Sequence, residues 1–158
     1  MKMKKLLQFK KTKLAMFIVA FSFVLNVQAQ NLTWAKNMGG TSLDNGLSIA
    51  VDASGNVYTT GYFQGTADFD PGIGVSNLTS MGGTDIFISK VSATGNFVWV
   101  KQLGGTSSDV GRSIKVDASG NVYTTGNFNG SVDFNPGAGT FSLTTVGPDD
   151  IFVSKLDA

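Results

Sequence analysis

Carboxylate and amide oxygens beside two Gly-rich turns are the first groups in this sequence that could do chemistry. Asp68 and Asp70 are alternate residues just before a Pro-Gly pair, and the same layout recurs as Asp133 and Asn135. Oxygen ligands spaced in this way can bind Ca²⁺. The longer Asp-x-Asp-x-Asp-Gly run of a calcium loop is absent from both copies. These four residues are therefore calcium candidates for which a plain turn, closed by the short side chain, is the favoured interpretation.

Few side chains in this sequence are suited to catalysis. The chain contains no His and no Cys, and all eleven acidic residues are Asp. The usual general base, the usual thiol nucleophile and the commonest zinc ligands are thus missing. Two Asp could act together in a glycan-active enzyme. Nearly every Asp recurs at the same place in an internal repeat, however, as residues that stabilise a fold do. We expect no enzymatic activity and no cofactor, with calcium left as the alternative.

Two further pairs of residues have a functional and a structural interpretation. Asp52 and Asp117 could contact a ligand, but a short carboxylate just before a turn can accept backbone N–H groups and fix the turn. Trp34 and Trp99 could stack on a sugar ring, but an aromatic residue on an alternating strand usually packs in a core. We favour the structural interpretation for both pairs.

These residues belong to two copies of one unit. An offset of 65 residues maps Trp34 onto Trp99 and Asp52 onto Asp117 without a gap, and 37 of the 60 residue pairs from Trp34/Trp99 onward are identical. Inside each unit, apolar residues alternate with polar ones, which predicts β-strands. Turns at 53–56 and 93–96 contain Gly-Asn and predict two hairpins, so that each unit supplies four strands.

The Gly-rich segment between the two hairpins, residues 64–84, is too long for a structureless loop in a compact unit. Residues 67–69 could pair with 77–79 across an Asp-Pro-Gly turn, and the second copy repeats the pattern. We therefore expect a small additional hairpin in each unit.

The first 29 residues have the layout of a secretory signal peptide: six Lys, an apolar run of about a dozen residues, and small residues at a cleavage site after Ala29. The alternative is a membrane anchor, for which the apolar run is short. Those six Lys are half of the twelve basic residues, so residues 30–158 carry a net charge of −5. A nucleic-acid partner is therefore not expected. We expect export through the inner membrane to the periplasm, the cell surface or the medium.

The stretch DIFISKVSATGNFVWVKQLGGTSSDVGRSIKVDASGNVYTTGNF, which begins at Asp85, resembles the SBBP family of β-propeller repeats, which occur in exported bacterial proteins. Neighbouring propeller families of the NHL type share part of the pattern. The resemblance implies an all-β fold of two four-stranded antiparallel blades, preceded by the signal peptide. It implies no catalytic residues. We expect a binding or structural module for an unknown protein or glycan, and a fragment of a longer propeller protein is an alternative.

Two blades form an incomplete propeller, because closed rings usually have four to eight. We expect residues 31–39 to be a strand that completes a blade, repeat one to span 40–104, and repeat two to span 105–158 without its last strand. Leu32 to Met38 and Asp150 to Leu156 would then be complementary free strands. A head-to-tail homo-oligomer of three or four copies, with six or eight blades, is the predicted assembly.

Overall fold

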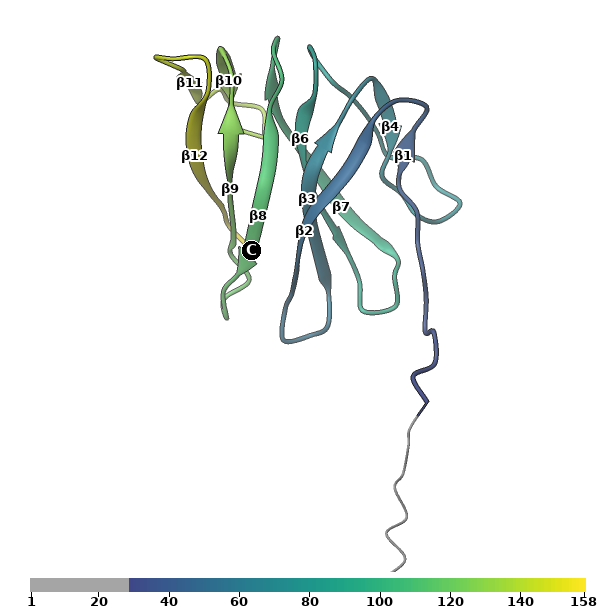
Figure 1. Ribbon diagram of the computed structural model, residues 1–158. Helices are drawn as coiled ribbons and strands as arrows, with labels where there is room; N and C mark the ends of the chain where they lie inside the picture. The colour runs from purple at the N-terminus through teal and green to yellow at the C-terminus, as the bar shows by residue number, and fades with distance from the viewer. Residues whose placement is uncertain (1–28) are drawn as a thin grey trace, which may run out of the picture. The chain divides into compact units, whose positions relative to one another are not determined.

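The computed structural model describes residues 29–158, and a compact unit spans Leu32–Ala158. The signal peptide predicted for residues 1–29 lies, except for Ala29, outside the described residues. Within the described part, every regular element is a strand and all strand pairs are antiparallel, which confirms the all-β prediction (Figure 1). The described residues include no helix that is long and apolar enough to cross a membrane.

The first blade is a four-stranded sheet in the order β2 (Asp44–Val51), β3 (Val57–Phe63), β6 (Asp85–Val91) and β7 (Phe97–Gly105). Its two main hairpins are those expected from the alternating pattern. In both turns a Gly adopts the positive φ that closes a tight hairpin, 80° at Gly55 and 76° at the equivalent turn residue of the second hairpin.

The second blade contains three strands within the described residues: β8 (Val110–Val116), β9 (Val122–Phe128) and β12 (Asp150–Leu156). They pair as β2, β3 and β6 do, with the same irregularity in the first strand after its glycine. The edge of β12 that faces away from β9 has no strand partner among the described residues. At the equivalent edge of the first blade, β6 is paired with β7.

The predicted extra hairpins are present in both repeats. In the first repeat, β4 (Thr66–Asp68) pairs with β5 (Asn77–Thr79), and β1 (Gly39–Gly40) lies on the other side of β4. In the second repeat, β10 (Ser131–Asp133) pairs with β11 (Ser142–Thr144) and with the end of β7. The long strand β7 therefore belongs to the first blade and also reaches the hairpin of the next repeat.

The two blades pack face to face. Strand β8 of the second blade lies against β2 and β3 of the first (Figure 1). The buried core between the blades takes side chains from both sheets, including Tyr58, Ile86 and Ile88 from the first and Ile114 and Phe152 from the second. Burial of these large apolar side chains is the main stabilising contribution that this architecture offers, since the chain has no cysteine for a disulfide.

Residues Leu32 to Met38, which we expected to complete a blade, have no strand partner among the described residues, and pairing begins only at β1. That they complete a blade remains a prediction. A strand requires a ladder partner, and the described residues contain no third strand of a preceding blade for this segment to pair with. The segment is nevertheless held in place, because the Trp34 indole N–H donates to the carbonyl of Ala93 over 3.0 Å.

Candidate functional site

The outer side of the second blade combines an unpaired strand edge with exposed aliphatic side chains. Ile151 and Val153 on β12 are 84% and 77% exposed, although the equivalent residues of the first blade, Ile86 and Ile88, are completely buried. Ile151 and Val153 are exposed because no further blade of the described chain covers them. Strand edges with free N–H and C=O groups beside apolar side chains are typical sites of strand addition.

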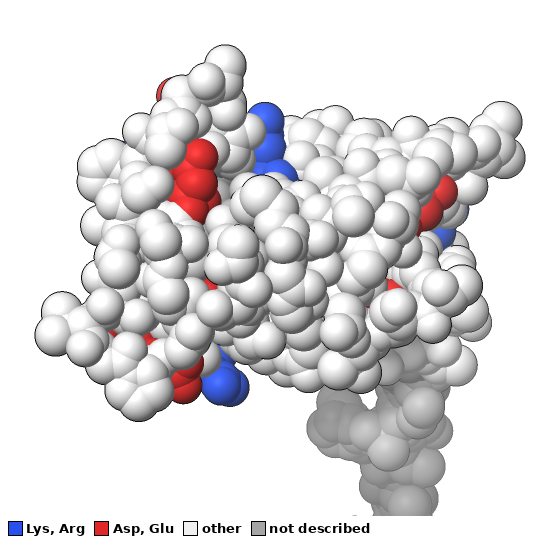
Figure 2. All heavy atoms as spheres, turned by 90° about the horizontal axis from the view of Figure 1, so that it is seen from above, with Lys and Arg blue, Asp and Glu red and all other residues white. Residues whose placement is uncertain are grey.

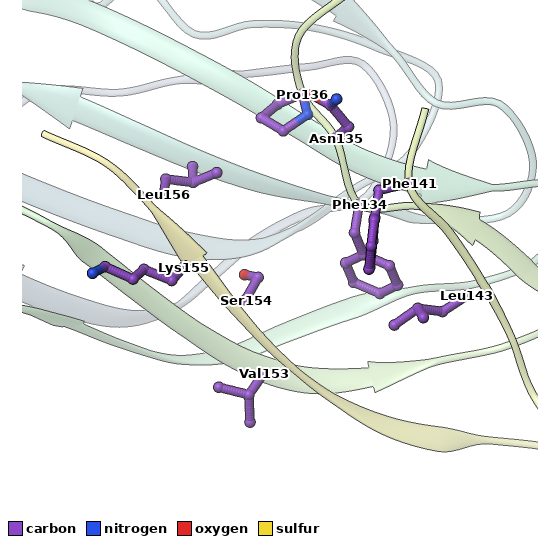
Figure 3. A pocket seen from close by; sticks show the side chains of 9 residues that line it. All are labelled: Phe134, Asn135, Pro136, Phe141, Leu143, Val153, Ser154, Lys155 and Leu156. Atoms are coloured by element: carbon purple, nitrogen blue, oxygen red, sulfur yellow. The ribbon is translucent and has the colours of Figure 1, made fainter. Parts of the chain in front are cut away.

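A pocket of about 350 Å³ opens along this edge, between β12 and the extra hairpin of the second repeat (Figure 3). Phe134, Phe141 and Leu143 contribute its apolar lining, and Ser154 and Leu156 contribute from β12. The Ser154 hydroxyl is buried without a hydrogen-bond partner. A segment that bound here would therefore meet an apolar surface and one polar group in need of a partner.

The same position in the first blade shows what fills this space. Val100 on β7 is directly opposite Ser89 on β6, and it packs against a buried cluster that contains Phe69 and Phe87. Ser89 corresponds to Ser154 in the repeat, and Phe69 corresponds to Phe134. The pocket is therefore the place that a fourth strand fills in the first blade.

The other side of the compact unit carries a second apolar face. Ile49 on β2 is 65% exposed, whereas its equivalent on β8, Ile114, is 1% exposed because it packs against the first blade. Leu47 and Val51 are exposed beside Ile49. The described chain thus presents two different apolar faces. In each case residues at equivalent positions of the other repeat are buried between the two blades.

The structure places the four calcium candidates at the turns of the extra hairpins, with Asp68 and Asp133 ending β4 and β10 and with Asp70 and Asn135 in the turns that follow. Oδ1 of Asp68 accepts the N–H groups of Asp70 and Ser76, and Oδ1 of Asp133 accepts those of Asn135 and Phe141, at 2.8 to 3.0 Å. The backbone N–H of Ser76 makes the largest contribution to the lowered pKa of Asp68. The side chains of Asp70 and Asn135 likewise accept the N–H two residues further on. Within residues 29–158 no cluster of three or more His, Cys, Asp or Glu side chains is present. These bonds agree with the turn interpretation, and calcium binding remains an untested alternative.

The turn role expected for Asp52 and Asp117 is confirmed. Oδ1 of Asp52 accepts the N–H groups of Ser54 and Asn56 at 2.9 Å, and Oδ2 accepts the Asn56 amide and the Tyr58 hydroxyl. The Asn56 amide is the largest cause of the lowered pKa of Asp52. The same four bonds recur around Asp117. The oxygens of both carboxylates thus already accept hydrogen bonds from their own hairpins.

Trp99 packs in the core between the blades, as expected, with its ring edge toward Tyr58 at a centroid distance of 6.0 Å. Trp34 lies against Gly95 in a turn of the first blade. The equivalent of Tyr58 in the second blade, Tyr123, has no Trp beside it and is 36% exposed. In both blades a Lys ammonium lies over the Tyr ring, 4.9 Å from Tyr58 and 5.5 Å from Tyr123.

Asp85 and Asp109 are fully buried, which the residue pattern alone did not indicate. Burial raises the pKa of both carboxyl groups, and the nearby charge of Asp85 further raises that of Asp109. Asp109 accepts the N–H groups of Gly105 and Asn129, whereas Asp85 accepts the Gln102 amide and has one oxygen, Oδ1, without a partner. A sign of both residues was present in the sequence, because each recurs as Asp in the other repeat. Asp85 corresponds to Asp150 at the start of a strand, and Asp109 corresponds to Asp44. Solvent does not reach either group, so the pair is not an open substrate cleft.

Comparison with known proteins agrees with this architecture. Residues 98–132 match the SBBP family, described as a beta-propeller repeat. An uncharacterized WD repeat-containing protein of Acanthamoeba polyphaga mimivirus is 30% identical over 114 residues, which are 63% of this chain and 8% of that protein. The regulatory protein FlaEY of Caulobacter vibrioides is 29% identical over 115 residues, which are 70% of this chain and 12% of that protein. The chain thus corresponds to a small part of each of these relatives.

Proposed function

Since this chain carries a β-propeller repeat of the SBBP family, we propose that it is an exported, non-catalytic module that acts in binding. The observation that supports a binding role most directly is the pair of exposed aliphatic faces, one around Ile49 and one around Ile151 and Val153. Contiguous apolar surface flanked by a free strand edge is typical of interaction sites.

A non-catalytic role is supported by the use made of the carboxylates. Asp52, Asp68, Asp117 and Asp133 each accept backbone N–H groups in a turn. Asp85 and Asp109 are buried. Figure 2, which views the molecule from above, shows the charged side chains of this face as small separate groups on a mostly uncharged surface. A general acid and a nucleophile need two carboxylates that face one substrate. The turn carboxylates instead accept N–H groups of their own turns, and the two buried carboxylates face the protein interior.

The chemistry of the exposed faces favours a protein partner over a glycan. The residues that define the two faces, Leu47, Ile49, Val51, Ile151 and Val153, are all aliphatic, whereas sugar rings are usually bound on flat aromatic side chains. Both Trp residues lie partly buried against the protein itself. A β-strand or the apolar face of another β-sheet is the partner that such a surface fits.

The test combines location, binding and activity. Mass spectrometry of the protein recovered outside the cytoplasm should give a chain that begins at Gln30, as cleavage after Ala29 requires. Protein and glycan arrays probed with that material should give protein ligands, and Ile151→Asp should remove them. Hydrolysis of a glycan by the purified protein, abolished by Asp70→Asn or another exposed Asp substitution, would overturn the proposal.

A further inference from the structure

We propose that a second copy of this chain completes the second blade, by adding its residues Leu32 to Met38 to the free edge of β12. The inference concerns assembly and does not depend on what the proposed module binds. It rests on a correspondence of positions, because the equivalent contacts are already formed once inside the molecule, between the first blade and β7 or between the two blades.

The donor segment is already held where a fourth strand lies. Gly39 and Gly40 pair with Asp68 and Ala67 of the first repeat's hairpin. At the end of β7, two glycines pair with the equivalent residues of the second repeat's hairpin in the same register. The N–H of Gly40 also donates to Asp44, as that of its counterpart in β7 does to Asp109. Leu32 to Met38 therefore precede the first blade just as the rest of β7 precedes the second.

The acceptor edge has matching side chains. In the first blade, Ser89 is opposite Val100, and Lys90 is opposite Trp99. The repeat offset places Ala35 opposite Ser154 and Trp34 opposite Lys155 when the segment pairs with β12. Trp34 would then approach the exposed ring of Tyr123, as Trp99 approaches Tyr58.

The two repeats differ in side-chain size in a complementary way. Ala35 is smaller than Val100, the residue whose place it would take, and would fill the pocket less completely. Phe141, which lines that pocket, stands where the first repeat has the much smaller Ser76. A larger wall residue in the second repeat thus accompanies a smaller residue in the donor segment, as close packing of the two would require.

The blade faces match as well. After strand addition, the face around Ile49 in the second copy would cover Ile151 and Val153 in the first, as Ile114 is covered beside Ile86 and Ile88. Gly111 allows that internal contact, because a Cβ there would lie 2.3 Å from Thr60 Oγ1 and 2.9 Å from Ile86 Cγ2. Gly46 is its equivalent on the open face of the first blade, where a Cβ would meet no atom closer than 3.4 Å. Rings of whole copies have an even number of blades, so three or four copies give six or eight.

Disulfide trapping tests the predicted register. The chain has no cysteine, and two directly opposed residues in an antiparallel ladder lie within disulfide range. We expect a mixture of Ala35→Cys and Ser154→Cys proteins to form a disulfide-linked dimer with one copy of each under mild oxidation. The matched control, Ala35→Cys mixed with Lys155→Cys, should not form it, because Lys155 points to the other side of the sheet. Equal trapping in both mixtures, or none in the first, would overturn the proposal.

Sedimentation velocity provides the second measurement. We expect the wild-type protein to form trimers or tetramers that dissociate on dilution. Gly46→Ala should weaken this assembly at least tenfold and leave the circular dichroism of the monomer unchanged, because its added methyl obstructs only the contact between copies. Ile73→Asp, an exposed turn substitution, is the control that should assemble normally. A wild-type protein that stays monomeric up to about 100 µM would contradict the inference.

Discussion

Ile88 and Val153 hold the same position in the two blades but have opposite environments: Ile88 is completely buried, whereas 77% of Val153 is exposed. The difference arises because the second blade covers Ile88 and the described residues offer nothing to cover Val153. Position in the repeat fixes which face of the sheet a side chain occupies. Only the neighbouring blade decides whether that face is core or surface.

This pair gives the first prediction, on stability. Ile88→Ala should lower the free energy of unfolding by about 2 to 5 kcal/mol, because it opens a cavity between the blades. Val153→Ala should change it by less than about 0.5 kcal/mol in the dissociated monomer. Urea unfolding at low protein concentration measures both. Equal losses would mean that Val153 is covered in the monomer.

The close approach of the blades at Gly111 gives a second prediction. Gly111→Ala should destabilise the protein by about 1 to 3 kcal/mol, because the new methyl would overlap Thr60 and Ile86. Gly46→Ala, at the equivalent open position, is the matched control and should be nearly neutral in the monomer. Thermal unfolding followed by circular dichroism compares the two variants. A tolerated Gly111→Ala would show that the blades are further apart than described.

The turn carboxylates give a third prediction. Asp52→Ala removes the acceptor for the N–H groups of Ser54 and Asn56, and it should lower the midpoint of thermal unfolding. Asp52→Asn keeps one acceptor oxygen and should lower the midpoint less. Amide hydrogen exchange should localise the loss of protection to the turn between β2 and β3. Loss of protection spread over both blades would instead indicate a role beyond this hairpin.

The fourth prediction concerns pH. Burial raises the pKa of Asp85 above its ordinary value of 3.8, so the folded state holds this proton more tightly than the unfolded state does. The resulting contribution to stability is complete below about pH 3.8 and is lost as the pH rises through the raised pKa. Asp85→Asn removes the ionisable group. The variant should therefore gain stability relative to wild type as the pH rises from about 4 to 7.

Urea unfolding of both proteins at several pH values measures this difference. Asp109→Asn is the informative comparison, because both oxygens of Asp109 accept backbone N–H groups and an amide can replace only one of them. That variant should be less stable than wild type at pH 4, where Asp85→Asn has little effect. A stability difference between Asp85→Asn and wild type that does not vary with pH would argue against a raised pKa.

Calcium is the subject of the fifth prediction. Oδ1 of Asp68 and of Asp133 already accepts two backbone N–H groups each, so metal binding would have to break or share those bonds. We expect millimolar calcium, or its removal by a chelator, to leave the midpoint of thermal unfolding unchanged. A rise of several degrees with calcium that Asp68→Asn abolishes would instead identify a metal site.

Much of the blade could be predicted from the sequence, because its signals are local. Alternation of apolar residues predicted the strands, and Gly-Asn pairs predicted the turns. Asp52 and Asp117 indicated the hydrogen bonds that close the first turn of each unit. The 65-residue offset indicated that the strands, turns and extra hairpin of one unit recur in the other. The hairpin at 67–79 also followed from local turn chemistry.

Burial and strand completion depended on the tertiary structure, because they are properties of pairs of distant segments. Leu32 to Met38 carry the residue pattern of a strand, yet no ladder forms where no partner strand is present. Asp85 and Asp109 are fully buried, whereas their repeat counterparts Asp150 and Asp44 are only half-buried. Ile49 and Ile114 also occupy the same repeat position, and they differ in exposure because only Ile114 packs against another blade. The sequence by itself determined the repeated unit and its local hydrogen bonds. Packing between units decided which copy of the blade-face residues is core and which is exposed, because covering the face of a blade requires a second blade.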